Sequence, residues 1–117
     1  MIDNHLVWPT IESLIAAYKL MDADGNLVPD LESRTIARRR QIALRKYFEE
    51  NGLLTVKAFD DDGSVIDRQY RKNDFTDDGF GLCKRKVPAW MKSKASAKDP
   101  PDMKLLEKAL VEIRAGE

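Results

Sequence analysis

The sequence predicts an α+β fold with about four helices and one β-hairpin or small antiparallel sheet. Two observations indicate this class. Four segments repeat apolar residues at spacings of three and four, and one segment places β-branched and aromatic residues on both sides of an Asp-Gly turn. The predicted order is helix, helix, hairpin, helix, helix. A chain of 117 residues has the size of one domain, so residues 1–117 are expected to form a single domain.

The first helix is expected over about residues 10–21. Thr10 is a suitable N-cap residue. The apolar residues that follow have helical spacing: Ile11, Leu14, Ile15 and Tyr18. The next segment, DADGN, is predicted as a turn because Asp, Gly and Asn favour turns.

The acidic turns also raise the possibility of calcium binding. In DADGN the carboxylates alternate, but an EF-hand loop needs Gly at its sixth and Glu at its twelfth position. Those positions hold Leu27 and Ser33. The turn that begins at Asp60 fails in the same way, with Val65 and Arg71 in those positions. Turn formation is therefore the preferred interpretation, and the sequence predicts no metal and no cofactor.

The second helix is expected over residues 34–52, where Asn51-Gly52 ends it. A helical wheel gives it one broad apolar face: Ile36, Ala37, Ala43, Leu44, Tyr47 and Phe48. Arg34, Arg38 and Arg45 lie on the opposite face. Arg40 falls within the apolar arc, where a lone charge would be costly, so we expect an internal ion pair there.

The segment LLTVKAF-DDDG-SVIDRQY, residues 53–70, is predicted as the hairpin. A lone hairpin is only marginally stable in water, so it must lie on the helices or pair with a third strand. Residues near 27 are the candidate for that third strand.

The last two helices are expected over about residues 76–91 and 100–116. Thr76 is the predicted cap of the first, and Pro88 is expected to kink it or divide it into two. Cys83 and Trp90 fall on its apolar stripe and are expected in the core, with Cys83 as an inert thiol. Residues 93–99 are expected to form a flexible loop, and the prolines at 100 and 101 suit a helix start.

The net charge is zero, but acidic and basic residues alternate in blocks. Residues 1–33 and 58–78 are acidic, residues 34–57 and 79–98 are basic, and residues 99–117 are weakly acidic. Such blocks either neutralise one another in the fold or form separate faces of opposite potential.

Two candidate binding faces follow from these blocks. The acidic face suits a basic protein and comprises Asp60, Asp61, Asp62, Asp67, Asp74, Asp77 and Asp78. The basic face suits an acidic protein or nucleic acid and comprises Arg34, Arg38, Arg45, Lys84, Arg85, Lys86 and Lys92. A single histidine and a single cysteine give little basis for a His-based metal cluster or catalytic triad, and no carboxylate pair stands out for catalysis.

The sequence therefore predicts a small non-enzymatic protein that binds another protein through a charged surface. An immunity-type inhibitor of a bacterial toxin is one protein of this kind. The alternative is a nucleic-acid-binding accessory protein that uses the basic helix 34–52 and the basic segment 84–98. A cytoplasmic location is expected, because the N-terminus does not resemble a signal peptide and the lone cysteine fits a reducing compartment. No membrane association is expected.

Overall fold

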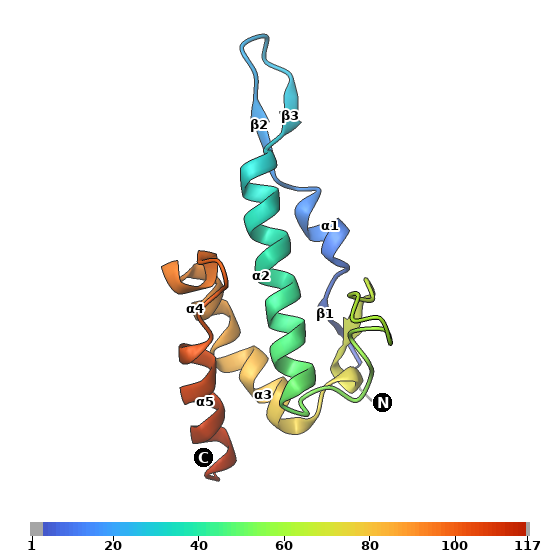
Figure 1. Cartoon of the computed structure of the whole chain (residues 1–117), viewed down its shortest axis with the longest axis vertical. Coiled ribbons are helices and arrows are strands. Elements are labelled where there is room, and N and C mark those ends of the chain that lie inside the picture. The colour runs from blue at the N-terminus through green and yellow to red at the C-terminus, as the bar shows by residue number, and fades with distance from the viewer. Residues whose placement is uncertain (1–3, 117) are drawn as a thin grey trace.

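A computed structural model of the chain describes residues 4–116 and confirms the α+β class (Figure 1). Within these residues, five α-helices are accompanied by two antiparallel sheets of two strands each. The elements in chain order are β1 (Leu6–Trp8), α1 (Ile11–Ile15), β2 (Lys19–Met21), β3 (Leu27–Pro29), α2 (Leu31–Glu50), β4 (Tyr70–Arg71), α3 (Asp77–Arg85), α4 (Val87–Lys92) and α5 (Lys104–Arg114). Two short 3₁₀ helices complete the fold: η1 (Lys72–Asp74) and η2 (Lys94–Ala97).

Helix α2 is the axis of the molecule. Helices α3, α4 and α5 lie on one side of it, and β1 and α1 lie on the other (Figure 1). Leu44 and Phe48 of α2 are fully buried between these two sides. The main core contains the α2 side chains Leu44, Tyr47 and Phe48. Leu82, Trp90 and Leu106 join them from the three C-terminal helices.

Strand β1 brings an aromatic cluster against α2. It pairs antiparallel with β4, opposing Trp8 to Tyr70. The Trp8 ring meets Phe48 and Phe75 edge to face, with each pair of ring centroids 4.9 Å apart. Aromatic pairs favour this geometry because the positive edge of one ring faces the negative face of the other. The N-terminal strand, which the sequence did not predict, is thus fixed by Trp8.

The first helix is shorter than predicted. Thr10 caps α1 as expected, accepting a hydrogen bond from the Ser13 amide, but the helix ends at Ile15. Residues 19–21 form a strand instead. The reason lies in the turn that follows, where the Asp22 carboxylate accepts hydrogen bonds from the Asp24 and Asn26 amides. Gly25 supplies the positive φ of 83° that this turn requires.

The hairpin predicted over residues 53–70 is also wrong in its pairing. Its turn forms, with the Asp60 carboxylate accepting the Asp62 and Ser64 amides. The flanking runs share one isolated bridge, Phe59 with Val65. Tyr70 pairs with β1 instead. The predicted third strand near residue 27 exists as β3, but its partner is β2.

The C-terminal half agrees more closely with expectation. Thr76 caps α3 by accepting a hydrogen bond from the Gly79 amide, and the helix breaks at Lys86, with Pro88 in the first turn of α4. Trp90 is fully buried, and its indole donates to the Asp102 carbonyl. Two details differ: α5 begins at Lys104, so the prolines precede the helix, and the expected loop at 93–99 contains η2.

Candidate protein-binding surfaces

Residues 18–30, called the arm below, form a hairpin that projects beyond the N-terminal end of α2 (Figure 1). Its register places Met21 opposite Leu27 and Leu20 opposite Val28. Side chains alternate between the two faces of a strand, so each face of the arm carries one apolar pair. Within the described chain, none of these four residues belongs to a buried core cluster.

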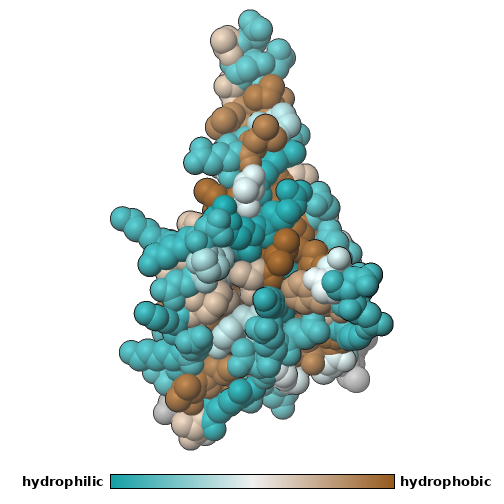
Figure 2. Space-filling model, viewed as in Figure 1, coloured by the Kyte–Doolittle hydropathy of each residue, from teal (hydrophilic) through white to brown (hydrophobic). Residues whose placement is uncertain are grey.

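The arm concentrates the exposed apolar surface of the protein. Five of the eight large apolar side chains that are exposed in the described chain lie on the arm or at the first residue of α2 that follows it: Tyr18, Leu20, Met21, Leu27 and Leu31. Met21 and Leu27 are 68% and 65% exposed. Figure 2 shows apolar atoms gathered along this narrow end of the molecule. Single exposed apolar residues are ordinary, whereas a group of them marks an interaction surface.

The base of the arm is tied firmly to α2. The Asp30 carboxylate caps this helix by accepting from the Ser33 amide and hydroxyl, and these bonds lower the pKa of Asp30. The Arg34 Nε donates to the Tyr18 carbonyl at 3.1 Å, and the Asp30 amide donates to the same carbonyl. These bonds fix the direction of the arm while its apolar faces stay open to solvent.

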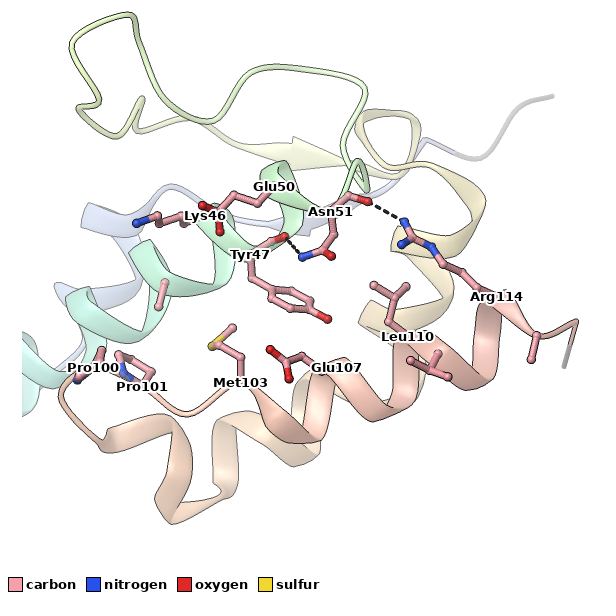
Figure 3. A pocket seen from close by; sticks show the side chains of 13 residues that line it. Lys46, Tyr47, Glu50, Asn51, Pro100, Pro101, Met103, Glu107, Leu110 and Arg114 are labelled. Carbon is pink, nitrogen blue, oxygen red and sulfur yellow. Dashed lines mark hydrogen bonds between the residues drawn. The ribbon is translucent and has the colours of Figure 1, made fainter.

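A second candidate surface is a groove of about 790 Å³ between the C-terminal half of α2 and α5 (Figure 3). The Tyr47 side chain points from α2 toward α5, where it lies among Met103, Glu107 and Leu110. Tyr47 and Leu110 belong to the main core, so the floor of the groove is the outer side of that core. Burial raises the pKa of the Tyr47 hydroxyl, and the Glu107 carboxylate adds to this effect.

The groove is closed at one end by Arg114. Its guanidinium donates to the Asn51 carbonyl at 2.6 Å and lies 3.6 Å from the Asp78 carboxylate, which joins α5 to the ends of α2 and α3. Toward the N-terminal end of α2 the groove continues into a smaller hollow bordered by Arg38, Arg39 and Lys46. None of the charged residues predicted for binding lines the groove itself. Its lining combines apolar side chains such as Met103 and Leu110 with four charged residues: Lys46, Glu50, Glu107 and Arg114.

The predicted acidic face is divided among several structural roles. Asp67 accepts the amides of Ile11 and Glu12 and so holds the start of α1. Asp74 accepts the Arg71 amide and pairs with Arg68 at 3.3 Å. Asp78 pairs with Arg114.

The remaining members of the acidic face are more exposed. Asp60, Asp61 and Asp62 lie in an exposed turn, where Asp61 pairs with Lys57 at 3.1 Å. Asp77 is exposed in the first turn of α3, where its charge suits the helix dipole. Several of the seven carboxylates therefore already bind amides or basic side chains of the protein itself.

The predicted basic face also separates. Arg34 and Arg38 lie at the arm end of α2, where Arg38 pairs with Glu12 at 3.0 Å. The second group lies on α3, α4 and the turn between them: Lys84, Arg85, Lys86 and Lys92. The ion pairs Arg38–Glu12 and Arg39–Asp99 each join a basic block of the chain to an acidic one. Some of the acidic and basic blocks therefore neutralise each other within the fold, which is one of the two arrangements expected from the sequence.

Arg45 was predicted on the basic face, and this was wrong because its side chain is fully buried. Its guanidinium lies over the rings of Trp8 and Tyr70, 5.1 and 5.3 Å from their centroids. It donates to the Gln41 side-chain oxygen at 2.8 Å and to the Pro9 carbonyl at 3.1 Å. Burial lowers the pKa of Arg45, although Tyr70 and Asp67 oppose the shift. The wheel placed Arg45 outside because it could not show that β1 and β4 cover this side of α2.

The ion pair predicted for Arg40 is also absent from the described chain. Arg40 borders a hollow next to Leu14, Tyr18 and Pro88, and its Nε is buried without a hydrogen-bond partner. The stem of the side chain is partly covered, as expected for an arginine within an apolar arc. The internal arginine is therefore Arg45, held by neutral acceptors and aromatic rings.

Three further features concern metal ligands, membrane-spanning helices and the single cysteine. Among residues 4–116, no three His, Cys, Asp or Glu side chains are placed to hold a metal ion. No helix in the described part of the chain is long and apolar enough to cross a membrane. Cys83 is buried, and burial raises the pKa of its thiol.

The arm was the main surface missed from the sequence. Its signal was the DADGN turn with LM before it and LV after it, but the helical spacing upstream obscured this pattern. In comparisons with known proteins, no family model, no curated protein and no solved structure matches the chain.

Proposed function

We propose that this chain is a non-enzymatic, cytoplasmic binding protein that attaches to another protein through the arm. The observation that carries the proposal is the gathering of four exposed apolar side chains on one projecting hairpin, with a fifth, Leu31, at its base. Their exposure stabilises nothing in the fold, so contact with another molecule explains their presence better than packing does.

A protein is the partner class that this hairpin suits best. A two-stranded sheet leaves an unpaired row of backbone donors and acceptors on the outer edge of each strand, and such edges add strands from other chains. The anchored base reduces the conformational entropy that is lost on binding. Exposed charges beside the arm, including Glu12 and Arg38, favour a partner with the matching charge pattern.

The test is photo-crosslinking inside cells. A photoreactive amino acid replaces Leu27 in one variant and Ile66, which is 37% exposed and far from the arm in sequence, in a control variant. We expect covalent protein adducts from position 27 and few from position 66. Equal or absent adduct formation at the two positions would overturn the proposal.

Within this class we propose an immunity- or antitoxin-type inhibitor of a bacterial toxin as the finer function. The support is the small size of the chain together with the exposed acidic turn Asp60–Asp62, which suits a basic toxin such as a nuclease. Coexpression with the product of the adjoining gene tests it. A stable complex that suppresses the toxin's activity is expected, and unchanged toxicity would reject it.

A second candidate function is nucleic-acid binding through α3, α4 and η2. The observation that favours it is a group of basic residues with no carboxylate within ion-pair distance in the described chain: Lys84, Arg85, Lys86, Lys92 and Lys94. Trp90, the aromatic residue within this segment, is fully buried and so is not placed to stack on a base. Gel shifts at two salt concentrations test this candidate, since phosphate contacts weaken steeply as salt rises.

A further inference from the structure

We infer that the arms of two copies of this chain pack against each other, antiparallel and face to face, to form a symmetric dimer. This inference rests on the proposed function, because it names a second copy of the chain as the protein that the arm binds.

The order of side chains along one face of the arm carries the inference. Lys19 and Met21 are two residues apart on β2, so their side chains lie on the same face of the arm. Leu27 lies opposite Met21 and shares that face. The face thus runs from a basic residue at the base, through an exposed apolar pair, to an acidic tip. Asp24 lies exposed at that tip, while the Asp22 carboxylate beside it is bonded to the Asp24 and Asn26 amides.

Two arms that run in opposite directions are complementary along this face, because the basic end of each lies next to the acidic end of the other. In an antiparallel arrangement the apolar pair of one arm covers the apolar pair of the other, and each acidic tip lies against the partner's Lys19. A twofold axis through the apolar pairs makes both ends of the contact equivalent, so the assembly closes at two copies. A parallel arrangement would instead place tip against tip and base against base, with like charges together.

The arm reaches a second copy without hindrance from its own body. It projects from the N-terminal end of α2, away from the helices that form the core (Figure 1). The molecule is 54 Å long but only about 33 Å across, and the arm forms its narrow end (Figure 2). Because only the two short arms meet, we expect an interface below the roughly 1,200–2,000 Å² of a stable complex, and hence a weak dimer that forms at high protein concentration.

The test is a charge exchange measured by sedimentation equilibrium on the full chain. Lys19→Asp alone places two acidic groups together at both ends of the contact, and Asp24→Lys alone places two basic groups there. Each variant is expected to raise the dimer Kd about tenfold or more. Both positions are exposed, so the fold should persist, and circular dichroism checks that it does.

The decisive measurement is the mixture of the two variants. In a mixed dimer the new carboxylate at position 19 of the first variant meets the new ammonium group at position 24 of the second. At the other end, the unchanged Asp24 meets the unchanged Lys19, so both ends are attractive again. We expect the equimolar mixture to recover dimers with a Kd near that of the unchanged chain. Met21→Ser should abolish dimers, whereas the control Ile66→Ser should leave them unchanged.

Two outcomes would overturn the inference: an unchanged chain that stays monomeric at every concentration tested, or a mixture that stays as monomeric as its two components. The photo-crosslinks at position 27 separate this failure from failure of the proposed function. Adducts with a different protein would support arm-mediated protein binding while rejecting the second copy as its partner.

Discussion

Replacing Gly79 by alanine tests how closely α3 packs on the turn that leaves α2. A Cβ atom built at Gly79 would lie 2.3 Å from the Leu53 carbonyl oxygen and 3.0 Å from the Leu53 Cβ. The first neighbour is backbone, so no side-chain rotation relieves the overlap. The same carbonyl accepts a hydrogen bond from the Thr76 amide at 3.0 Å, which ties the start of α3 to residue 53.

The size of the effect follows from this geometry. An ordinary contact begins at 3.4 Å, so α3 and Leu53 must separate by roughly 1 Å. Overpacking of this kind costs about 1–3 kcal/mol, and weakening the Thr76 hydrogen bond costs about 1 kcal/mol more. The higher helix propensity of alanine offsets at most about 1 kcal/mol of this loss in stability. We therefore expect Gly79→Ala to lower the free energy of unfolding by about 2 kcal/mol, with Tm lower by roughly 8 °C.

Gly81 is the matched control within the same helix. A Cβ atom there would have one neighbour within 4 Å, the Ile113 Cδ1 at 3.9 Å, which is an ordinary contact. Gly81→Ala should therefore be neutral or stabilising by up to about 1 kcal/mol. Urea and thermal unfolding, followed by circular dichroism, measure both variants. If Gly79→Ala is as stable as Gly81→Ala, the packing argument is wrong.

Three further predictions concern buried groups. Arg45→Ala should lower the free energy of unfolding by about 3 kcal/mol, because it leaves a cavity between two aromatic rings. The control Arg38→Ala removes an exposed ion pair and should change the free energy of unfolding by less than about 1 kcal/mol. Equal urea midpoints for the two variants would contradict the burial of Arg45. Arg40→Met should be neutral or stabilising in the same assay, since no ion pair to Arg40 exists in the described chain and its Nε is unsatisfied. The Cys83 thiol should resist a thiol reagent at pH 8 in the folded chain and react readily in denaturant, because burial raises its pKa and blocks access; equal rates would show that it is exposed.

The sequence predicted best where local chemistry and packing agree. Thr76 caps α3 and Pro88 accompanies its break because both effects depend on residues close in the chain. Trp90 is in the core because an apolar stripe at helical spacing has one favourable side to bury. The Asp22 and Asp60 turns likewise follow from carboxylates that bond to their own backbone.

Strand pairing could not be predicted, because a strand is stabilised by a partner that local sequence does not specify. The run ending at Tyr70 had the composition of a hairpin strand, yet it pairs with Leu6–Trp8, more than sixty positions away. The segment 19–21 continued a helical pattern, but the turn after it pairs it with residues 27–29 as a hairpin instead.

The candidate binding surface likewise could not be predicted from the sequence. Alternating blocks of charge were visible, but three-dimensional contacts decide which charges remain exposed, and several pair with one another. The helical wheel placed Arg45 in solvent, while β1 and β4 cover it.

By itself, then, the sequence determined the α+β class, the helix caps and breaks, and the residues of the C-terminal core, since these depend on hydrogen bonds and periodicity within short segments. Only the tertiary structure decided which strands pair, which arginine is buried and which apolar residues remain uncovered on the arm. Those outcomes depend on which surfaces meet across the chain, and burial is a property of both surfaces together.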